Sequence, residues 1–248
     1  MDTQLARCHS SIRQILGRKA EPLKSVELVE QYRRYWRPDQ VKTILLAESH
    51  VYTRGKDRDL VLKEIPCLPG YPTHYCRFVY CLAYGERELI KNGQHVRRDG
   101  TPQYWELLYS CNNRISARSG FPPILKKATR HRARLRHKIR LLQALKQRGI
   151  WLVDASIVAV YKRKKKKPKP AAIKKVIRAS WEGYTRATIE EARPVHVICV
   201  GKGIFDLLES DIRRIVGDNV DWVYQPNSRL TAKSRLENLK KISTLCSE

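Results

Sequence analysis

Several features are scarce or missing in this sequence, and each excludes a class of protein. No stretch approaches the roughly 18 consecutive apolar residues of a membrane-spanning helix, and the N-terminus lacks the apolar core of a signal peptide. We therefore expect a cytoplasmic protein, associated with the nucleoid if its source is bacterial, that has no membrane partner. The seven cysteines include no Cys-x-x-Cys pair, which argues against a zinc knuckle and against a disulfide framework.

Reduced thiols are the simplest interpretation of the cysteines. The spacings of four of them match no common iron–sulfur pattern, so we expect core or half-buried side chains and predict no metal and no other cofactor. These four are Cys67, Cys76, Cys81 and Cys111.

Acidic residues are also scarce, which leaves a strong positive charge. Lysine and arginine number 50 against 24 aspartate and glutamate residues, a formal net charge of +26. Such a charge favours binding to a polyanion, most often nucleic acid. A basic RNA-binding or ribosome-associated protein would carry the same charge without any catalytic site. At 248 residues and 42% hydrophobic content, the chain can bury a core.

Apolar runs of strand length recur along the chain and are separated by segments with helical patterns. The runs are rich in Val and Ile and mostly lack alternation with polar residues, which is typical of parallel strands covered on both faces. The sequence therefore predicts an α/β fold, a three-layer α/β/α sandwich with a central, mainly parallel four-stranded sheet. The expected strands cover 41–47, 149–160, 195–201 and 219–226, and the expected helices include 25–36, 101–113, 123–148 and 230–242.

Two segments concentrate the basic residues. The expected helix 123–148 combines an apolar stripe with a basic remaining surface. The run KRKKKKPKPAAIKK, 162–175, follows the second strand, and its prolines and like charges indicate a loop insertion. Because the run follows the carboxyl end of a strand, it is expected to bind phosphates. Alternatively, it is only a solvated surface loop or a targeting tag. The residues expected to contact a phosphate backbone are Lys164, Lys165, Lys166, Lys167, Arg130 and Arg134.

Polar side chains gather where the expected strands end. The first strand, in ILLAESHVY, changes abruptly from apolar residues to Glu, Ser and His. Open α/β sheets bind ligands outside the carboxyl ends of their strands, so the sequence predicts a site at this edge. Each of these residues alone would also fit a hydrogen-bonded core position. The residues concerned are Glu48, Ser49, His50, Asp154, Ser156, Gln225 and Asn227.

The order of these motifs resembles the uracil-DNA glycosylase superfamily over roughly residues 40–245. ILLAESHVY stands in the place of the strand that ends in the family's water-activating motif, and GIWLVDASIVAVY in that of the strand whose Asn reads the flipped base. SWEGYTRATIEE resembles the helix that follows, VHVICVGKGIFDLL the third strand, and YQPNSRL the His-Pro-Ser loop that clamps the minor groove. The resemblance implies a single domain, 1–248, with an N-terminal helical region at 1–38 and the insertion at 162–175, acting on DNA as a monomer.

The departures from the family pattern fall on its chemistry. Ser49 stands where the best-known branch has Asp, whereas Glu48 matches the acidic position of other branches. Gln225 replaces the usual His, so it can donate a hydrogen bond to a base carbonyl but cannot become a cation. Asp154 replaces the Asn that reads the base. No Lys is evidently placed as a Schiff-base nucleophile, so the enzyme implied is a monofunctional DNA glycosylase that leaves an abasic site.

Glu48 is the expected centre of the reaction. Cleavage of an N-glycosidic bond requires the nucleotide to leave the stack and the sugar to be stabilised as an oxocarbenium-like ion. Glu48 would orient a water and oppose that positive charge, with His50 as a hydrogen-bonding neighbour, a proton carrier or only a core partner. The catalytic residues implied are Glu48, Ser49, His50, Asp154 and Gln225.

The flipped base needs a pocket, and the gap it leaves needs a wedge. An aromatic platform is expected from HYCRFVYCLAY, with Phe78 preferred over Tyr75 and Tyr80, although core packing is the alternative for each. Arg229 or Leu230 is expected to enter the gap in the duplex. The base-binding residues implied are Tyr52, Phe78, Asp154 and Asn227.

Asp154 suggests which base is released. An ionised carboxylate only accepts hydrogen bonds, so it suits the exocyclic amine of cytosine better than uracil, and a protonated one could also donate to the ring nitrogen. Because unmodified cytosine must be refused, we expect a 5-substituted cytosine, such as the hydroxymethylated or glucosylated bases of some phage genomes. The setting would be anti-phage defence. The alternatives are uracil repair and a catalytically inactive nucleic-acid-binding member of the same fold.

Overall fold

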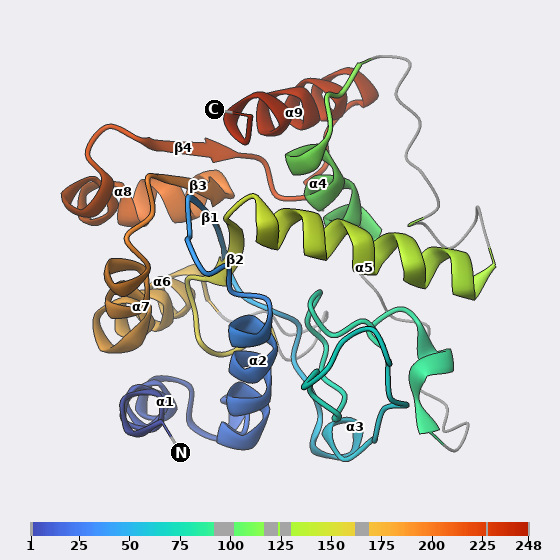
Figure 1. Ribbon diagram of the computed structural model, residues 1–248. Coiled ribbons are helices and arrows are strands. Elements are labelled where there is room, and N and C mark those ends of the chain that lie inside the picture. The colour runs from blue at the N-terminus through green and yellow to red at the C-terminus, as the bar shows by residue number, and fades with distance from the viewer. Residues whose placement is uncertain are drawn as a thin grey trace. The chain divides into compact units, whose positions relative to one another are not determined.

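Figure 1 shows a computed structural model of the protein, which describes residues 2–91, 102–116, 124, 130–161, 169–226 and 228–247. The strands are β1 (Thr43–Ala47), β2 (Ile150–Asp154), β3 (His196–Val200) and β4 (Val220–Val223). The α-helices are α1 (Thr3–Leu16), α2 (Leu23–Tyr35), α3 (Gly55–Arg58), α4 (Pro102–Asn112), α5 (His131–Gln147), α6 (Pro170–Ser180), α7 (Arg186–Ala192), α8 (Lys202–Val216) and α9 (Ala232–Leu245). Short helical turns are η1 (Gly17–Lys19) and η2 (Arg87–Leu89), and η4 (Trp181–Thr185) is a π-helical turn.

The strands form one parallel four-stranded sheet in the order β2-β1-β3-β4. In the β3–β4 pair, Val197 lies opposite Val220 and Val200 opposite Val223. Every residue of β1 and β2 is buried, as expected for apolar parallel strands between helices. The predicted α/β/α fold class is thereby confirmed.

The chain divides into two compact units, each built from separate stretches of sequence. The first unit comprises Met1–Tyr35, Ala47–Arg98 and Val153–Arg193, and the second comprises Trp36–Leu46, Asp99–Leu152 and Pro194–Glu248. In sequence, the chain passes from the second unit to the first at the ends of β1 and β2. The expected N-terminal helical region contains α1 and α2, while the single domain stays a prediction.

A glycine sets the start of β2. Gly149 has φ +77°, and a Cβ atom there would lie 2.7 Å from the Gln40 carbonyl oxygen, so any other residue would be strained and would clash. The Gly149 carbonyl accepts hydrogen bonds from the N–H groups of Lys42 and Thr43 at 2.8 and 3.1 Å. These bonds place β2 beside β1.

β2 is shorter than the predicted strand, because side chains hold the backbone after Asp154 in a bend. Ser156 Oγ donates to the Val158 carbonyl at 2.7 Å. The Ile157 N–H donates to Ser180 Oγ at 3.2 Å. Hydroxyl groups that bond nearby backbone compete in this way with a regular strand.

In the first unit, the segment after β2 also supplies core residues. α1 and α6 pack against each other, and their apolar faces join the side chains of this segment in one buried cluster. Its members are Leu5, Cys8, Ile12, Val26, Ile157, Val158, Val160, Val176 and Tyr184.

In the second unit, β4 lies at one edge of the sheet, where side chains of α9 cap its backbone. The Asn238 amide accepts from the Tyr224 N–H at 2.8 Å and donates to the Tyr224 carbonyl at 3.2 Å. Lys241 Nζ donates to the Trp222 carbonyl at 2.8 Å. Backbone groups that a strand partner would otherwise bind are therefore occupied.

None of the helices in the described ranges is long and apolar enough to cross a membrane.

Candidate active site at the ends of β1 and β2

Backbone hydrogen bonds join the segments that follow β1 and β2. The Ala155 N–H donates to the Ala47 carbonyl at 2.6 Å, and the Ser156 N–H donates to the Glu48 carbonyl at 3.0 Å. The Val160 N–H then donates to Ser49 Oγ at 3.4 Å. The residues that sequence reasoning assigned to the two strand ends therefore lie side by side in the first unit.

His50 lies between two carboxylates at the centre of this cluster. Its Nε2 is 2.7 Å from Glu21 Oε2, and its Nδ1 is 3.1 Å from Asp154 Oδ2. All three residues are buried. Glu21 also accepts from the N–H groups of Thr53 at 2.8 Å and Ala159 at 3.0 Å, so its carboxylate holds three loops together.

The two carboxylates keep the His50 imidazole charged. Burial lowers the pKa of His50, but the charges and hydrogen bonds of Glu21 and Asp154 outweigh it and raise this pKa from 6.5 to about 9. Both ring nitrogens of an imidazolium are donors, which matches a carboxylate oxygen at each nitrogen. At neutral pH, His50 is therefore a cation whose donors are both occupied.

The ion pairs continue from Asp154 towards the surface of the first unit. Arg33 Nη2 donates to Asp154 Oδ2 at 2.9 Å, and the same guanidinium pairs with Glu30. Glu30 in turn accepts from Arg34 Nε at 3.1 Å, and Arg34 pairs with Asp2. The side chain of Arg34 is 55% exposed. We call the buried part, formed by Glu21, His50, Asp154, Arg33 and Glu30, the buried charge cluster.

Asp154 therefore has a different environment from the one expected. It was predicted to read a flipped base, but it is 3% exposed and one of its oxygens already contacts two cations. In this structure Asp154 binds Arg33 and His50, not an open pocket.

Glu48 and Ser49 are only half-buried and lie outside the buried charge cluster. Glu48 Oε1 accepts a hydrogen bond from the Tyr161 hydroxyl at 3.3 Å. Burial, together with the negative charge of Glu48, raises the pKa of Tyr161 to about 12, so the phenol stays protonated and remains a donor. Glu48 is thus the strand-end carboxylate that is accessible to solvent.

The predicted aromatic platform lies in the core. Phe78 is 3% exposed, and its ring packs edge-on against His50 and against Tyr80, with centroid distances of 6.2 and 5.2 Å. The Arg33 guanidinium lies over the same ring, 5.4 Å from its centroid. Phe78 therefore shields the buried charge cluster, and the prediction that it stacks on a flipped base is wrong for this structure. Tyr52 is half-buried.

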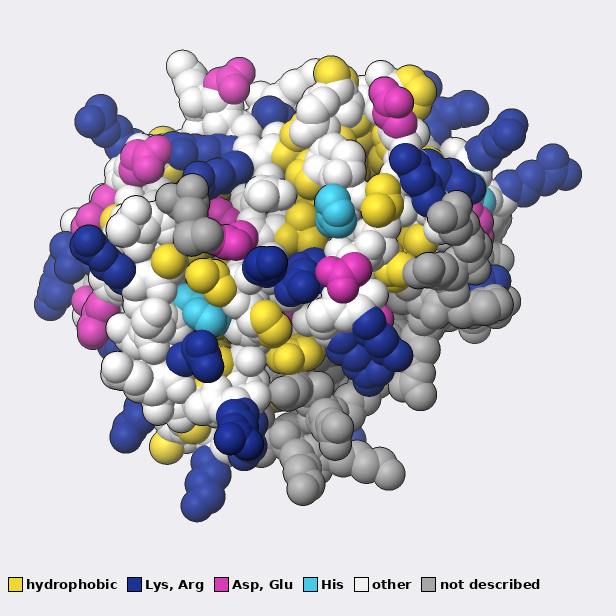
Figure 2. Space-filling model, turned by 90° about the horizontal axis from the view of Figure 1, so that it is seen from below, with side chains coloured by type: hydrophobic (Ala, Val, Ile, Leu, Met, Phe, Trp, Pro, Cys, Tyr) yellow, Lys and Arg dark blue, Asp and Glu magenta, His cyan; other side chains and the backbone are white. Residues whose placement is uncertain are grey.

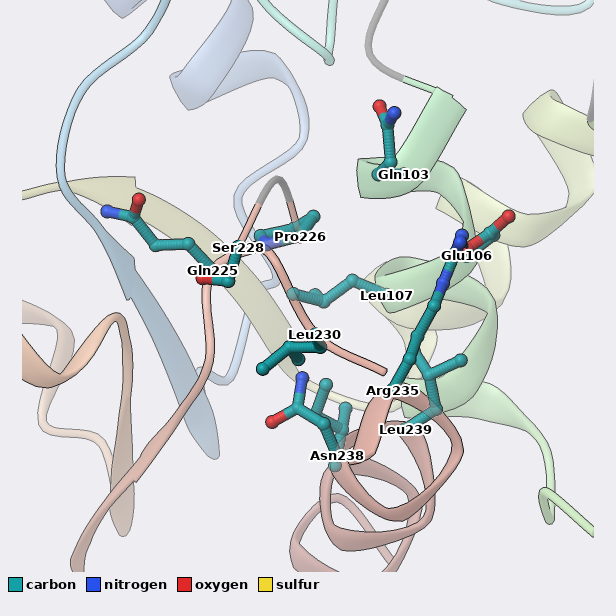
Figure 3. Close-up of a pocket in the computed structure, with 11 residues that line it drawn as sticks. Gln103, Glu106, Leu107, Gln225, Pro226, Ser228, Leu230, Arg235, Asn238 and Leu239 are labelled. Carbon is teal, nitrogen blue, oxygen red and sulfur yellow. Dashed lines mark hydrogen bonds and ion pairs between the residues drawn. The ribbon is translucent and has the colours of Figure 1, made fainter. Parts of the chain in front are cut away.

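In the second unit, the segment after β4 borders a cavity of about 180 Å³ (Figure 3). Gly201 has φ +127°, where another residue would be strained, and a Cβ atom added there would lie 2.9 Å from Gln225 Cγ. Leu230 faces this cavity beside Leu107, while the Gln225 amide points away from both. The cavity is lined by Gln103, Glu106, Leu107, Gln225, Pro226, Ser228, Leu230, Arg235, Asn238, Leu239 and Ile242.

Of the two expected wedge residues, Arg229 is the exposed one and Leu230 is half-buried. Asn227 lies outside the described residues. Gln225 is half-buried. The structure thus leaves Arg229 as the side chain presented to solvent.

The basic residues of α5 do not all face solvent. Arg130 is exposed just before the helix, but Arg134 is 7% exposed, so its predicted contact with phosphates is wrong for this structure. Lys138 is also buried, with Nζ 4.8 Å from the centre of the Trp105 ring, because its long stem packs while the ammonium meets an aromatic face. Lys164, Lys165, Lys166 and Lys167 lie outside the described residues.

Lys and Arg nevertheless predominate among the charged side chains on the face shown in Figure 2. Lys and Arg side chains outnumber Asp and Glu on that face and along its rim. This distribution agrees with the net charge of +26. The described surface is therefore electropositive on this face.

Sequence reasoning missed Glu21, Arg33 and Tyr161. Glu21 precedes a proline between two helices, and Arg33 lies within α2, so no strand-end pattern or spacing marked either residue. Tyr161 offered a signal, because it directly follows an apolar run and precedes the lysine run.

Comparison with protein-family models, with curated proteins and with solved structures finds no match to the chain.

Proposed function

We propose that the protein is a monofunctional DNA glycosylase in which Glu48 is the catalytic carboxylate. The observation that carries the proposal is the position of Glu48, which follows β1, is half-buried and has a tyrosine hydroxyl on one oxygen. The resemblance of the strand-end motifs to the uracil-DNA glycosylase superfamily supports the same assignment.

The environment of Glu48 suits the chemistry of base release. A carboxylate beside the sugar opposes the positive charge of an oxocarbenium-like transition state and can orient the attacking water. A hydroxyl donor at one oxygen helps to fix the orientation of the carboxylate. Because Glu48 is only half-buried, water can reach it, which both purposes require.

His50 supports the site in a role other than that of a general base. Its pKa of about 9 leaves it protonated at neutral pH, and both ring nitrogens are next to carboxylates. A general base needs a free lone pair, which an imidazolium lacks. We infer that His50 and Asp154 position the backbone that carries Glu48.

The positive surface suits the DNA substrate. Phosphate contacts by Lys and Arg supply most of the sequence-independent affinity for DNA. The charge of the chain and the basic face in Figure 2 support this part of the proposal. The preference for a 5-substituted cytosine depended on contact between Asp154 and the base. Because the Asp154 carboxylate is buried, we do not favour the cytosine derivatives over uracil as the substrate.

The test is base release from duplex and single-stranded DNAs that carry uracil, cytosine, 5-hydroxymethylcytosine or glucosylated 5-hydroxymethylcytosine. Alkali-labile abasic sites report the reaction. Glu48→Gln keeps the shape but removes the charge, so release should fall by about 10²- to 10⁴-fold. The control is Glu182→Gln, which removes an exposed carboxylate of η4 and should leave release unchanged. Full activity of the Glu48 variant would rule out this role.

A second candidate is a DNA-binding protein of this fold that has no catalysis. Two observations favour it, namely the engagement of His50 and Asp154 in the buried charge cluster and the presence of Gln225, which cannot become a cation. This protein would bind every DNA in the panel and release no base. Its affinity would also be indifferent to Glu48→Gln.

A further inference from the structure

Tyr161 differs from most other tyrosines of the first unit in its exposure. Its side chain is 38% exposed, whereas six others are buried, with at most 9% exposed. These six are Tyr32, Tyr71, Tyr75, Tyr80, Tyr84 and Tyr184. The exposed ring of Tyr161 therefore has no core-packing role comparable to theirs.

The position of Tyr161 is fixed by the segment that precedes it. Ser156, Ala159 and Val160 each donate a backbone hydrogen bond, to Glu48, Glu21 and Ser49 respectively. The Tyr161 hydroxyl then donates to the Glu48 side chain. The ring is thus held at one end by its hydroxyl and at the other by an anchored backbone, while part of it remains open to solvent.

We propose that Tyr161 is a stacking platform for an unpaired nucleobase beside Glu48. Every base has a π-face, so an exposed aromatic ring held in one orientation binds unpaired bases with little dependence on sequence. The net charge of +26 favours binding of the phosphates that accompany such a base. Phe78 cannot take this place, because its ring is buried against His50 and Arg33.

This inference rests on the DNA binding of the proposed function and not on its chemistry. The ring and the hydroxyl of Tyr161 can be separated by substitution. Tyr161→Phe keeps the ring and removes the hydrogen bond to Glu48, whereas Tyr161→Leu removes the ring and keeps an apolar side chain. Because the residue is exposed, both variants should fold, which thermal unfolding followed by circular dichroism will verify.

The experiment measures the affinity of the three proteins for two labelled single-stranded dodecamers by fluorescence anisotropy at one salt concentration. One is oligothymidylate, and the other has the same backbone with abasic analogues in place of the bases. We expect Tyr161→Leu to bind oligothymidylate about fivefold or more weakly than the natural protein, the lower end of base–aromatic stacking. Its affinity for the abasic strand should be unchanged. Tyr161→Phe keeps the ring and the anchored backbone, so it should bind oligothymidylate more tightly than Tyr161→Leu and bind the abasic strand as the natural protein does.

Any of four outcomes would overturn the platform. Tyr161→Leu could bind oligothymidylate normally, it could weaken on both strands equally, or Tyr161→Phe could lose as much affinity as Tyr161→Leu. Failure of the natural protein to bind oligothymidylate would also overturn it. None of these measurements requires base release, so an absence of glycosylase activity would refute the proposed function while the platform stands or falls on binding.

Discussion

Charged side chains near the end of β1 differ in how deeply they are buried. In the buried charge cluster, His50 and Arg33 lie between carboxylates, and their side chains are almost entirely shielded from water. Outside this cluster, Glu48 is half-buried and accepts a hydrogen bond from the hydroxyl of the exposed Tyr161. The two carboxylates that end neighbouring strands, Glu48 and Asp154, look equivalent in the sequence but differ in what they contact.

The difference separates a structural role from a chemical one. A buried charge must be paired, and removing one partner leaves the other uncompensated, so such groups are constrained by folding. A half-exposed carboxylate pays little to stay ionised and can meet a ligand. We therefore expect substitutions in the buried charge cluster to act mainly on stability, and substitutions of Glu48 or Tyr161 to act mainly on function.

The largest effect on stability should come from Arg33→Met. The substitution leaves Asp154 and Glu30 without the cation they share, and breaking a buried ion pair in this way costs about 3–5 kcal/mol in the free energy of unfolding. Urea-induced unfolding measures the loss. The control is Arg186→Met, because Arg186 pairs with Glu190 on the surface of α7, where such pairs contribute about 0.5 kcal/mol or less. Equal losses in the two variants would remove the distinction between the regions.

A somewhat smaller effect should appear as the pH is raised. The pKa of His50 is about 9 in the folded protein against 6.5 ordinarily, so the folded state binds this proton more tightly. The resulting stabilisation is fully present below pH 6.5 and is lost as the pH rises through about 9, at a cost on the order of 3 kcal/mol.

The measurement combines thermal unfolding from pH 5 to 10 with NMR titration of the His50 ring nitrogens. An imidazole of His50 that is neutral at pH 7 in the folded protein would contradict this prediction.

The smallest effect on stability is expected from the lysine run. Replacing Lys164–Lys167 by Ser should change the free energy of unfolding by no more than about 0.5 kcal/mol, as for most surface substitutions. DNA binding should become less dependent on salt, because each phosphate contact contributes about −0.9 to the log–log slope on B-DNA. Replacement of the same lysines by Arg keeps the charge and should preserve the slope. An unchanged slope in the Ser variant would leave the run as a solvated loop.

The fold class could be predicted because it depends on patterns that are local in the sequence. The runs that became β1 and β3 consist of apolar residues over the length of a strand, and burial on both faces follows from that composition. The position of Glu48, Ser49 and His50 after β1 follows from the abrupt change in polarity. The premature end of β2 was not predictable in this way, because it depends on Ser180, which is distant in the sequence.

The partners of the site residues could not be predicted either. Glu21 reaches His50 from 29 residues away, and Arg33 reaches Asp154 from 121 residues away. No spacing rule relates residues at such separations, so sequence reasoning treated Asp154 as free to read a base. The buried position of Phe78 is of the same kind, since it depends on the cluster that its ring covers.

The capped backbone of β4 has a consequence for how molecules of this protein meet one another. An edge strand with open N–H and C=O groups is a template on which a second chain can add a strand, and this is a common route to aggregation. Asn238 and Lys241 occupy such groups at Tyr224 and Trp222 with side chains of the same molecule. Sheet-to-sheet joining through this part of β4 would first have to displace α9 side chains, so the strand is protected against intermolecular pairing.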